Sequence, residues 1–192
     1  MDLAAFPHKR IQAGRLWYRQ HHLPPWYFSS NRKGRFDLDP PRGTCYLASR
    51  PEAAAREFIG ADVADAGFVA AALLRDRYVS ALTLPRDMRL AHTHHQDAIS
   101  HGVISNELCH MTPYDVPQAW ARAFDAAGFD GIWHTLRFST ATPRGVALFG
   151  TAGGADWPVD PHPTPLRTVV DSMRISVLDT PSLAETTVVQ PD

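Results

Sequence analysis

The chain has 192 residues, the size of one ordinary domain and enough to bury a sizeable core. Hydrophobic residues make up 44% of the sequence and charged residues 20%, as in soluble globular proteins, which excludes wholesale disorder. With 19 Lys and Arg against 20 Asp and Glu, the formal net charge is -1, so there is no overall basic field to attract nucleic acid or anionic lipid. Any anion-binding site must be local.

The N-terminal residues and the cysteines bear on where the protein works. The segment MDLAAFPHKRIQ lacks the apolar run of a signal peptide, and no stretch approaches the roughly 18 apolar residues of a membrane span. We therefore expect a cytoplasmic protein without a membrane segment. Cys45 and Cys109 lie far apart and in no CxxC spacing, so we interpret both as buried small residues and not as part of a disulfide framework or a thiol-rich zinc site.

The first third of the chain contains two predicted strands and the clearest helix. Arg15–His22 (RLWYRQHH) alternates apolar and polar side chains, as a half-buried strand does. GTCYLAS, at 43–49, follows a Pro-Pro-Arg-Gly turn and predicts a second strand. A helix is predicted over Pro51–Ile59, because Pro51 suits the first turn, Glu52 lies near its positive end and three alanines favour helix.

The rest of the chain carries weaker signals, and segments 68–78 and 97–109 are ambiguous. The predicted elements are a strand at 78–85, a helix starting near Pro117 and ending at Gly128, paired strands at 131–140 and 145–150, and a late strand within 166–178. No GxGxxG motif opens a helix, so the sequence does not predict a Rossmann type of NAD site.

Strands and helices mix without regular βαβ alternation, which predicts an α+β fold. We expect a single domain with a mixed or antiparallel sheet core flanked by short helices. We place this domain at residues 14–180, after an N-terminal extension (1–13) and before a frayed C-terminal tail (181–192).

Three residues at equal intervals are candidates for a binding site. Arg35, Tyr46 and Glu57 fall on a predicted loop, strand and helix, and Arg19 adds a cation on the first strand. An arginine suits two-point binding of pyrophosphate, a tyrosine can stack on a flat ring, and a carboxylate can stabilise developing positive charge. On composition alone a plainer interpretation is favoured, in which the arginines are solvated, Tyr46 belongs to the core and Glu57 lies on a helix face.

Several segments together resemble the RES domain family, over about Gly14 to Gly150. They are WYRQH (17–21), GRFD (34–37), GTCYLASRPEAAAREF (43–58), AGFDGIWHTLRF (127–138) and VALFG (146–150). The family comprises toxins of RES–Xre toxin–antitoxin pairs. The resemblance implies an ADP-ribosyltransferase-like fold and NAD as substrate, through NAD degradation, including phosphorolysis, or ADP-ribose transfer. It also implies an Xre-type antitoxin as partner, and we expect neither a resident cofactor nor a metal.

The resemblance also assigns roles to residues by motif matching. It implies Arg19 and Glu57 as catalytic residues, and Arg35 and Tyr46 as substrate-binding residues. In the implied reaction, Glu57 stabilises an oxocarbenium-like ribose while the two arginines bind pyrophosphate and Tyr46 flanks the nicotinamide ribose. The secondary candidates are Arg15, a rival for the first arginine, together with Tyr18, His134 and Arg137.

The chain departs from the family pattern at one position that bears on the reaction. The pattern DGI-x-Y-x-S-R-F appears here as DGIWHTLRF, with His134 in place of the usual aromatic and Leu136 in place of the Ser. Leu cannot donate a hydrogen bond, and on a continuing strand Thr135 faces away from position 136, so it does not replace the missing hydroxyl. A RES-like protein that binds NAD, another nucleotide or a partner without turnover is therefore an alternative.

A histidine-rich segment supports a third hypothesis. His92, His94 and His95 lie within four residues of one another, and His101 and His110 follow. His-x-His is a plausible metal-ligand spacing, which would suit a metal-dependent hydrolase. No HExxH motif is present and the neighbouring residues are polar, so a solvated loop is the favoured interpretation.

Overall fold

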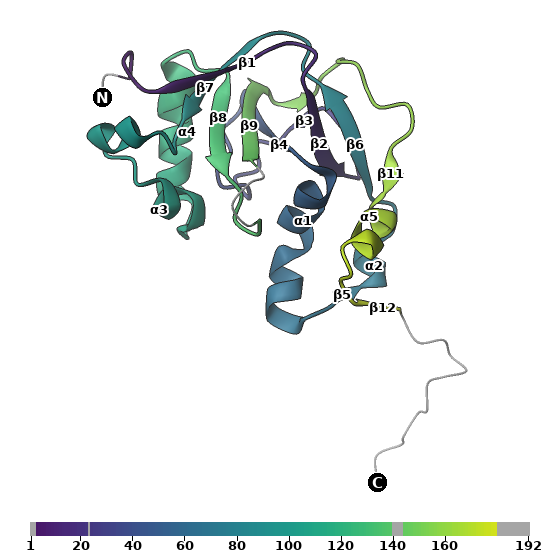
Figure 1. Ribbon diagram of the computed structural model, residues 1–192. Coiled ribbons are helices and arrows are strands. Elements are labelled where there is room, and N and C mark those ends of the chain that lie inside the picture. Colours follow the sequence, from purple (N-terminus) through teal and green to yellow (C-terminus); the bar gives the residue numbers. More distant parts are fainter. Residues whose placement is uncertain (1–2, 23, 140–143, 180–192) are drawn as a thin grey trace.

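The computed structural model describes residues 3–22, 24–139 and 144–179, and its main feature is an eight-stranded mixed sheet (Figure 1). In spatial order the strands are β1 (His8–Ile11), β7 (Met88–His92), β8 (Gly131–Thr135), β9 (Arg144–Thr151), β4 (Arg42–Ala48), β2 (Leu16–His21), β6 (Tyr78–Thr83) and β11 (Thr164–Pro165). Among the described residues β7 and β8 are the one parallel pair of this sheet. The mixed sheet with short helices confirms the predicted α+β fold.

Two small sheets and six helices complete the part of the chain that is described. The small sheets pair β3 (Tyr27–Phe28) with β10 (Gly153–Gly154), and β5 (Val69–Ala70) with β12 (Val177–Leu178). The helices are α1 (Pro51–Ala66), α2 (Ala71–Leu74), the 3₁₀ helix η1 (Gln96–His101), α3 (Ser105–His110), α4 (Asp115–Ala126) and α5 (Leu166–Ser172). None of them is long and apolar enough to cross a bilayer, within the described ranges.

The helices form two groups on one face of the sheet. In Figure 1, α3 and α4 lie beside β7 and β8, whereas α1, α2 and α5 lie near β2 and β6. The 3₁₀ helix η1 belongs to the first group, because its Ala98 is part of the same apolar cluster. The first group packs on a cluster that includes Ile132 and Ala147, and the second on a cluster that includes Ala48 and Val79. Side chains alternate along strands, so these sheet residues share one face, and the two groups of helices flank its centre.

The opposite face of the sheet carries its own apolar layer. Trp17, Trp26 and Phe28 are fully buried there, and Trp157 packs edge-on against Trp26 at 4.8 Å between ring centroids. Trp17 on β2, and Trp26 and Phe28 at β3, are therefore core residues. The two cysteines are free and buried, as predicted.

Helix α1 is longer than predicted, and the late strand is mostly a helix. Helix α1 continues to Ala66 and ends at Gly67, whose φ of 76° is left-handed and favours glycine. Segment 166–178 forms α5 and then β12, because Leu166, Val169 and Val170 recur at helical spacing and bury one face. Of the two ambiguous segments, 68–78 contains β5 and α2, and 97–109 contains most of η1 and α3.

The N-terminal segment differs from the predicted extension. Strand β1 pairs with β7 at the edge of the sheet, and Leu3 and Phe6 are buried in the cluster under α4. The structured domain therefore begins well before residue 14, because these two apolar residues cover the edge of the core. The predicted frayed tail, 181–192, lies outside the described residues.

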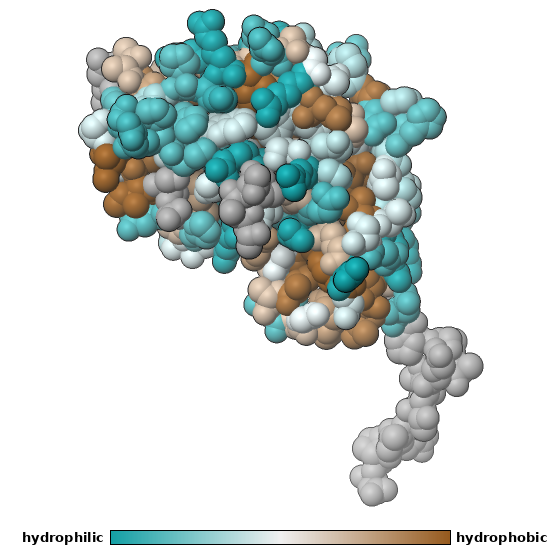
Figure 2. Space-filling view, viewed as in Figure 1, coloured by the Kyte–Doolittle hydropathy of each residue, from teal (hydrophilic) through white to brown (hydrophobic). Residues whose placement is uncertain are grey.

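The surface is polar over much of the face seen in Figure 2. Apolar side chains gather at the lower end, where the end of α1 meets β5 and β12. Phe68 and Leu178 are among the exposed large hydrophobic residues of this region. The cluster packed between α1 and α5 thus continues to the surface there.

Candidate active site

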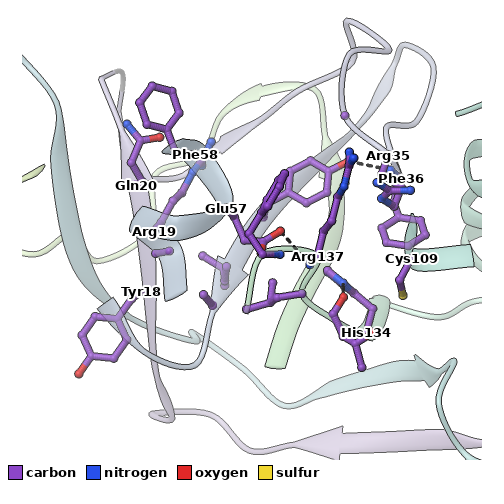
Figure 3. A pocket seen from close by; sticks show the side chains of 18 of the residues that line it. Tyr18, Arg19, Gln20, Arg35, Phe36, Glu57, Phe58, Cys109, His134 and Arg137 are labelled. Carbon is purple, nitrogen blue, oxygen red and sulfur yellow. Dashed lines mark hydrogen bonds between the residues drawn. The ribbon is translucent and has the colours of Figure 1, made fainter. Parts of the chain in front are cut away.

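A cavity of about 370 Å³ lies on the helical face of the sheet, between α1 and α3 (Figure 3). Its lining comes from β2 (Tyr18, Arg19, Gln20), the following loop (Lys33, Gly34, Arg35, Phe36), β4 (Tyr46, Leu47, Ala48), α1 (Ala54, Glu57, Phe58), the α3–α4 region (Cys109, Tyr114) and the end of β8 (His134, Thr135, Leu136, Arg137, Phe138). Seven of the eight predicted site residues are in this lining. The eighth, Arg15, is exposed ahead of β2 and lies over the Trp17 ring.

Glu57 occupies the middle of the cavity, between Arg19 on one side and Arg35 on the other in Figure 3. Its carboxylate accepts hydrogen bonds from the backbone N–H of Phe138 at 2.7 Å and of Arg137 at 3.2 Å. Burial raises the pKa of this carboxyl, while those hydrogen bonds and the charges of Arg35 and Arg137 oppose the rise. The carboxylate keeps acceptor capacity for a ligand, since two oxygens offer about four lone-pair sites.

Helix α1 brings Glu57 to this position by packing tightly against the turn after β8. A Cβ at Gly60 would collide with the ring of Phe138, so a glycine lets the turn approach the helix. The same turn supplies the two backbone donors to Glu57. The carboxylate and the turn therefore position each other.

Arg35 extends from the loop before β4 and is held by the α3–α4 connection. Its Nη1 donates to the Met111 carbonyl at 2.7 Å, and its guanidinium lies 4.8 Å from the centre of the Tyr114 ring. Burial lowers the pKa of Arg35, although an arginine stays charged at any physiological pH. Sequence reasoning missed Tyr114 and Met111, because neither belongs to a matched motif and both approach only through the fold.

Tyr46 lies on β4 beneath the Arg35 loop. Its hydroxyl donates to Asp37 at 2.8 Å and accepts from the backbone N–H of Phe36 at 2.8 Å, while its ring lines the cavity. Burial first, and then the Asp37 carboxylate, raise the pKa of this hydroxyl well above its ordinary value. Asp37 is 1% exposed and was missed as a site residue, although the GRFD motif contains it.

Arg19 is in the cavity lining, but its guanidinium is held on the other side of the sheet. Its Nη1 donates to the Pro25 carbonyl and, at 3.0 Å, to the Cys45 thiol. Alternation along β2 places Tyr18 on the cavity face and Arg19 on the face of Trp17. Arg19 therefore braces β2 against β4 and does not lie beside Arg35, where joint binding of pyrophosphate would require it.

The segment after β8 corrects the prediction of a continuous strand. The strand ends at Thr135, because the backbone N–H groups of Arg137 and Phe138 donate to Glu57. Consecutive residues from Thr135 to Phe138 consequently all line the cavity, so Thr135 does not face away from it. Leu136 is 7% exposed and packs in the apolar cluster of α1.

His134 and Cys109 form a buried wall near Arg35. The His134 Nδ1 is 2.8 Å from the Thr135 carbonyl, which can only accept, so this nitrogen carries the proton. Burial lowers the pKa of His134 to about 4, so the ring is neutral at physiological pH. Burial also raises the pKa of the Cys109 thiol, against hydrogen bonding with Thr135. Neither group carries charge into the cavity.

The charges around the cavity are strongly unequal. Among the described residues of its lining, Glu57 is the only carboxylate, whereas Lys33, Arg35 and Arg137 are cations, and the charged end of Arg19 lies on the other face of the sheet. Phe36, Phe58 and Phe138 add aromatic surface. A concave site of this composition suits an anionic ligand that also has a flat or apolar part.

The histidine-rich segment is separate from this cavity. The rings of His92 and His94 are in tilted contact at 4.3 Å between centroids, and His94 Nε2 accepts a hydrogen bond from Trp133. The His95 Nδ1 accepts from the backbone N–H of Asp97. In the described part of the chain, no group of three or more His, Cys, Asp or Glu could hold a metal ion. The metal-dependent hydrolase therefore has no structural support there.

Comparisons with known proteins give the family. No curated protein matches the chain. Among solved structures, the M. tuberculosis MbcT–MbcA toxin–antitoxin complex contains a similar chain, with a TM-score of 0.65 and 13% identity. The match covers 84% of this chain and 90% of that one, and at this identity it shows the fold alone. The family model of the RES domain matches residues 8–168, which include every residue that lines the cavity. The chain therefore belongs to the RES domain family.

Proposed function

We propose that this protein is a RES-type toxin that consumes NAD by cleaving the N-glycosidic bond between nicotinamide and ribose. The observation that carries the proposal is the position of Glu57, a half-buried carboxylate near Arg35 and Arg137 in a cavity with aromatic walls. NAD combines an anionic pyrophosphate, a flat ring and a ribose carbon that becomes positively charged when the bond breaks. Each part has a counterpart among the lining residues, and NAD is the substrate here, not a resident cofactor.

Arg35 is the residue best placed to bind the pyrophosphate. Its guanidinium is half-buried and already oriented by Met111 and Tyr114, so few side-chain rotamers are lost on binding. Lys33 and Arg137 add positive charge from exposed positions on the rim. A guanidinium in a partly desolvated site binds phosphate oxygens through charge-assisted hydrogen bonds, which are stronger than neutral ones.

Glu57 supplies the electrostatic part of the reaction. When the bond breaks, its electron pair goes to the ring nitrogen, nicotinamide leaves as a neutral molecule and positive charge develops on the ribose. A carboxylate beside that carbon stabilises the charge. The oxygen of water, phosphate or a protein side chain then bonds to the carbon and releases its proton. Glu57 can accept this proton, and burial, which raises the pKa of its carboxyl, makes it a better base.

A catalytically altered RES-like protein is the second candidate, and Leu136 favours it. The side chain at this position is buried with α1 and has no hydroxyl to offer a phosphate or ribose. Such a protein would bind NAD, a related nucleotide or a protein partner through the same cations. Calorimetry that detects NAD binding while the nucleotide remains intact supports this candidate over the first.

The proposal includes a protein antitoxin of the Xre type and a cytoplasmic location. A solved structure with a similar fold is a toxin–antitoxin complex, which supports a partner of this kind. Co-expression of the chain with its candidate antitoxin, followed by size-exclusion chromatography, tests the interaction. Growth arrest on expression of the chain alone, relieved by the second protein, is the expected result.

The direct test is to incubate the purified protein with NAD, with and without phosphate, and to follow the products by mass spectrometry. Nicotinamide release is expected, and the second product identifies hydrolysis, phosphorolysis or transfer. Glu57→Gln should lower the rate by roughly 100-fold or more, because the charge-stabilising group is lost. Glu52→Gln, on the same helix but outside the cavity, is the matched control. Intact NAD under all these conditions contradicts the proposal.

A further inference from the structure

The loop that carries Arg35 is fixed at the residue before it. The Gly34 N–H donates to Asp37 Oδ2 at 2.9 Å, and the Gly34 carbonyl accepts from Gln118 Nε2 at 3.0 Å and from the Asp37 N–H at 3.2 Å. Asp37 and Gln118 are 1% and 2% exposed, so water does not compete for these bonds. A Cβ at Gly34 would collide with the Asp37 carboxylate. The turn therefore requires glycine here.

The loop is also fixed at the residue after Arg35. The Phe36 N–H donates to the Tyr46 hydroxyl at 2.8 Å, and the Phe36 carbonyl accepts from the Thr44 hydroxyl at 2.8 Å. Phe36 and Thr44 are both fully buried. Asp37 joins the two halves, because its second oxygen accepts from the Tyr46 hydroxyl. Gly34 and Phe36, the two neighbours of Arg35, are thus both held by hydrogen bonds of their backbone N–H and C=O groups to buried side chains.

This network leaves the Tyr46 hydroxyl little capacity for a ligand. A tyrosine hydroxyl has one proton to donate, and here Asp37 receives it. One lone pair already accepts from Phe36. Asp37 is buried away from solvent and bonded on both oxygens. The polar atoms of this pair are bonded to the loop and to each other, and of the two residues Tyr46 alone is among those that line the cavity.

We propose that Asp37 and the Tyr46 hydroxyl are positioning residues: they hold Arg35 in the orientation that binds a nucleotide diphosphate, and neither contacts the ligand. The inference rests on the proposed function in one respect, the assignment of Arg35 as the anion-binding residue. It does not depend on catalysis. It also changes the role that the family resemblance implies for Tyr46, from substrate binding through its polar group to the alignment of another side chain.

A double-mutant cycle with ADP as the probe tests the inference, with affinity measured by calorimetry. Tyr46→Phe removes the hydroxyl and keeps the ring. Asp37→Asn keeps the shape of the side chain but replaces one of its two acceptor oxygens with an NH₂ group, so either the Gly34 N–H or the Tyr46 hydroxyl loses its acceptor. Each should weaken ADP binding roughly tenfold, the value of one well-aligned buried hydrogen bond. In an Arg35→Ala background the same changes should alter affinity by less than about twofold, because there is no longer a guanidinium to align.

The control variants are Tyr78→Phe and Asp65→Asn. Both residues are exposed and lie outside the cavity lining, so ADP affinity should be unchanged. If Arg35→Ala leaves no measurable binding, the cycle is run on Arg35→Lys, which keeps the charge but not the planar donors. The effect of Tyr46→Phe should shrink in that background too. Full additivity in either background overturns the inference, since it means that the hydroxyl acts on the ligand independently of Arg35.

Two other results also overturn it. One is unchanged ADP affinity in Tyr46→Phe and Asp37→Asn, and the other is failure of the wild-type protein to bind ADP. Failure of the proposed function is a different observation, namely intact NAD in the product assay. ADP binding with the expected non-additivity but no NAD consumption would leave the positioning role standing and remove the enzymatic one.

Discussion

The two arginines that the family resemblance pairs, Arg19 and Arg35, lie in very different surroundings. Arg35 comes from a loop, is flanked by fixed backbone on both sides and presents its guanidinium to the cavity over Tyr114. Arg19 comes from the centre of a sheet, where strand alternation turns its side chain to the other face and Cys45 and Pro25 take up its donors. The backbone of a loop can orient a side chain in many directions, whereas a side chain on a strand points to one or the other face of the sheet.

The two arginines therefore have different roles, since Arg35 is placed to bind a ligand and Arg19 holds parts of the protein together. At the Arg35 end, the cavity has a preformed cation with spare donors beside an aromatic ring. At the Arg19 end, the cation joins β2 to β4 and to the segment before β3. Substitutions at the first end should therefore change ligand affinity, and substitutions at the second should change stability.

The largest expected effect is on ligand affinity at the Arg35 end. Arg35→Ala should weaken ADP binding by roughly 100-fold, because charge-assisted bonds to phosphate are lost from a partly desolvated site. Arg19→Ala should weaken it by less than about fivefold, the effect of removing a more distant charge. Calorimetry at fixed ionic strength compares the two. Equal losses for both variants would show that Arg19 leaves Cys45 to bind the ligand.

The next effect concerns stability at low pH near the Arg35 end, where the His134 ring packs 5.1 Å from that of Phe36. The folded pKa of about 4 lies below the ordinary value of 6.5, so the unfolded chain binds a proton first as the pH falls. Stability present above pH 6.5 is therefore lost progressively toward pH 4. Between pH 7 and pH 5 this loss should be about 2 kcal/mol.

Urea unfolding at the two pH values, with His134→Phe as the comparison, isolates this contribution. The variant cannot protonate at position 134, so its stability should fall by about 2 kcal/mol less than that of the wild type. Other groups, including the buried carboxyls whose pKa values are raised, are common to both proteins and cancel. Equal pH dependence in the two proteins contradicts the assignment of a buried, neutral His134.

A smaller effect is expected at the Arg19 end. Arg19→Ala removes the donors to Cys45 and Pro25 and leaves the carbonyl in a partly buried site without this partner. The free energy of unfolding should drop by about 1.5 kcal/mol, measured in urea. Arg15→Ala, at an exposed position just ahead of the same strand, is the matched control, and it should lower the free energy of unfolding by less than about 1 kcal/mol, because only a cation–π contact of an exposed side chain is lost. A larger loss of unfolding free energy in Arg15→Ala than in Arg19→Ala would contradict the assignment of Arg19 as the residue that holds β2 against β4.

The sequence predicts those elements and residue positions that depend on neighbouring residues alone. Strand β2 follows from alternation, α1 from Pro51 and its alanines, and the Arg35, Tyr46 and Glu57 positions from motifs that the RES family shares. The direction of the Arg19 side chain was available in principle, since the same alternation that predicts the strand also puts Arg19 on the face of Trp17.

Long-range contacts explain what the sequence does not predict. The strand after Gly131 ends at Thr135 because a carboxylate 80 residues earlier takes the next backbone donors, and no local pattern contains that information. Tyr114 approaches Arg35 through the connection between α3, which lies in a segment that the sequence leaves ambiguous, and the predicted helix α4. Asp37 is visible in GRFD, but its partner Tyr46 lies on the next strand, so its positioning role appears only after folding.

The smallest expected effect sharpens the description of the Arg35 end. Tyr114→Leu removes the ring under the guanidinium and should weaken ADP binding by roughly three- to fivefold, in line with a partly exposed cation–π contact. Tyr114→Phe keeps the ring and should bind ADP like the wild type, which distinguishes stacking from a hydrogen bond of the hydroxyl. Equal weakening in both variants would mean that the hydroxyl, not the ring, acts at this end. Because Met111 still accepts from Arg35 after either change, an affinity loss in Tyr114→Leu as large as that of Arg35→Ala would require direct stacking of the ligand on Tyr114.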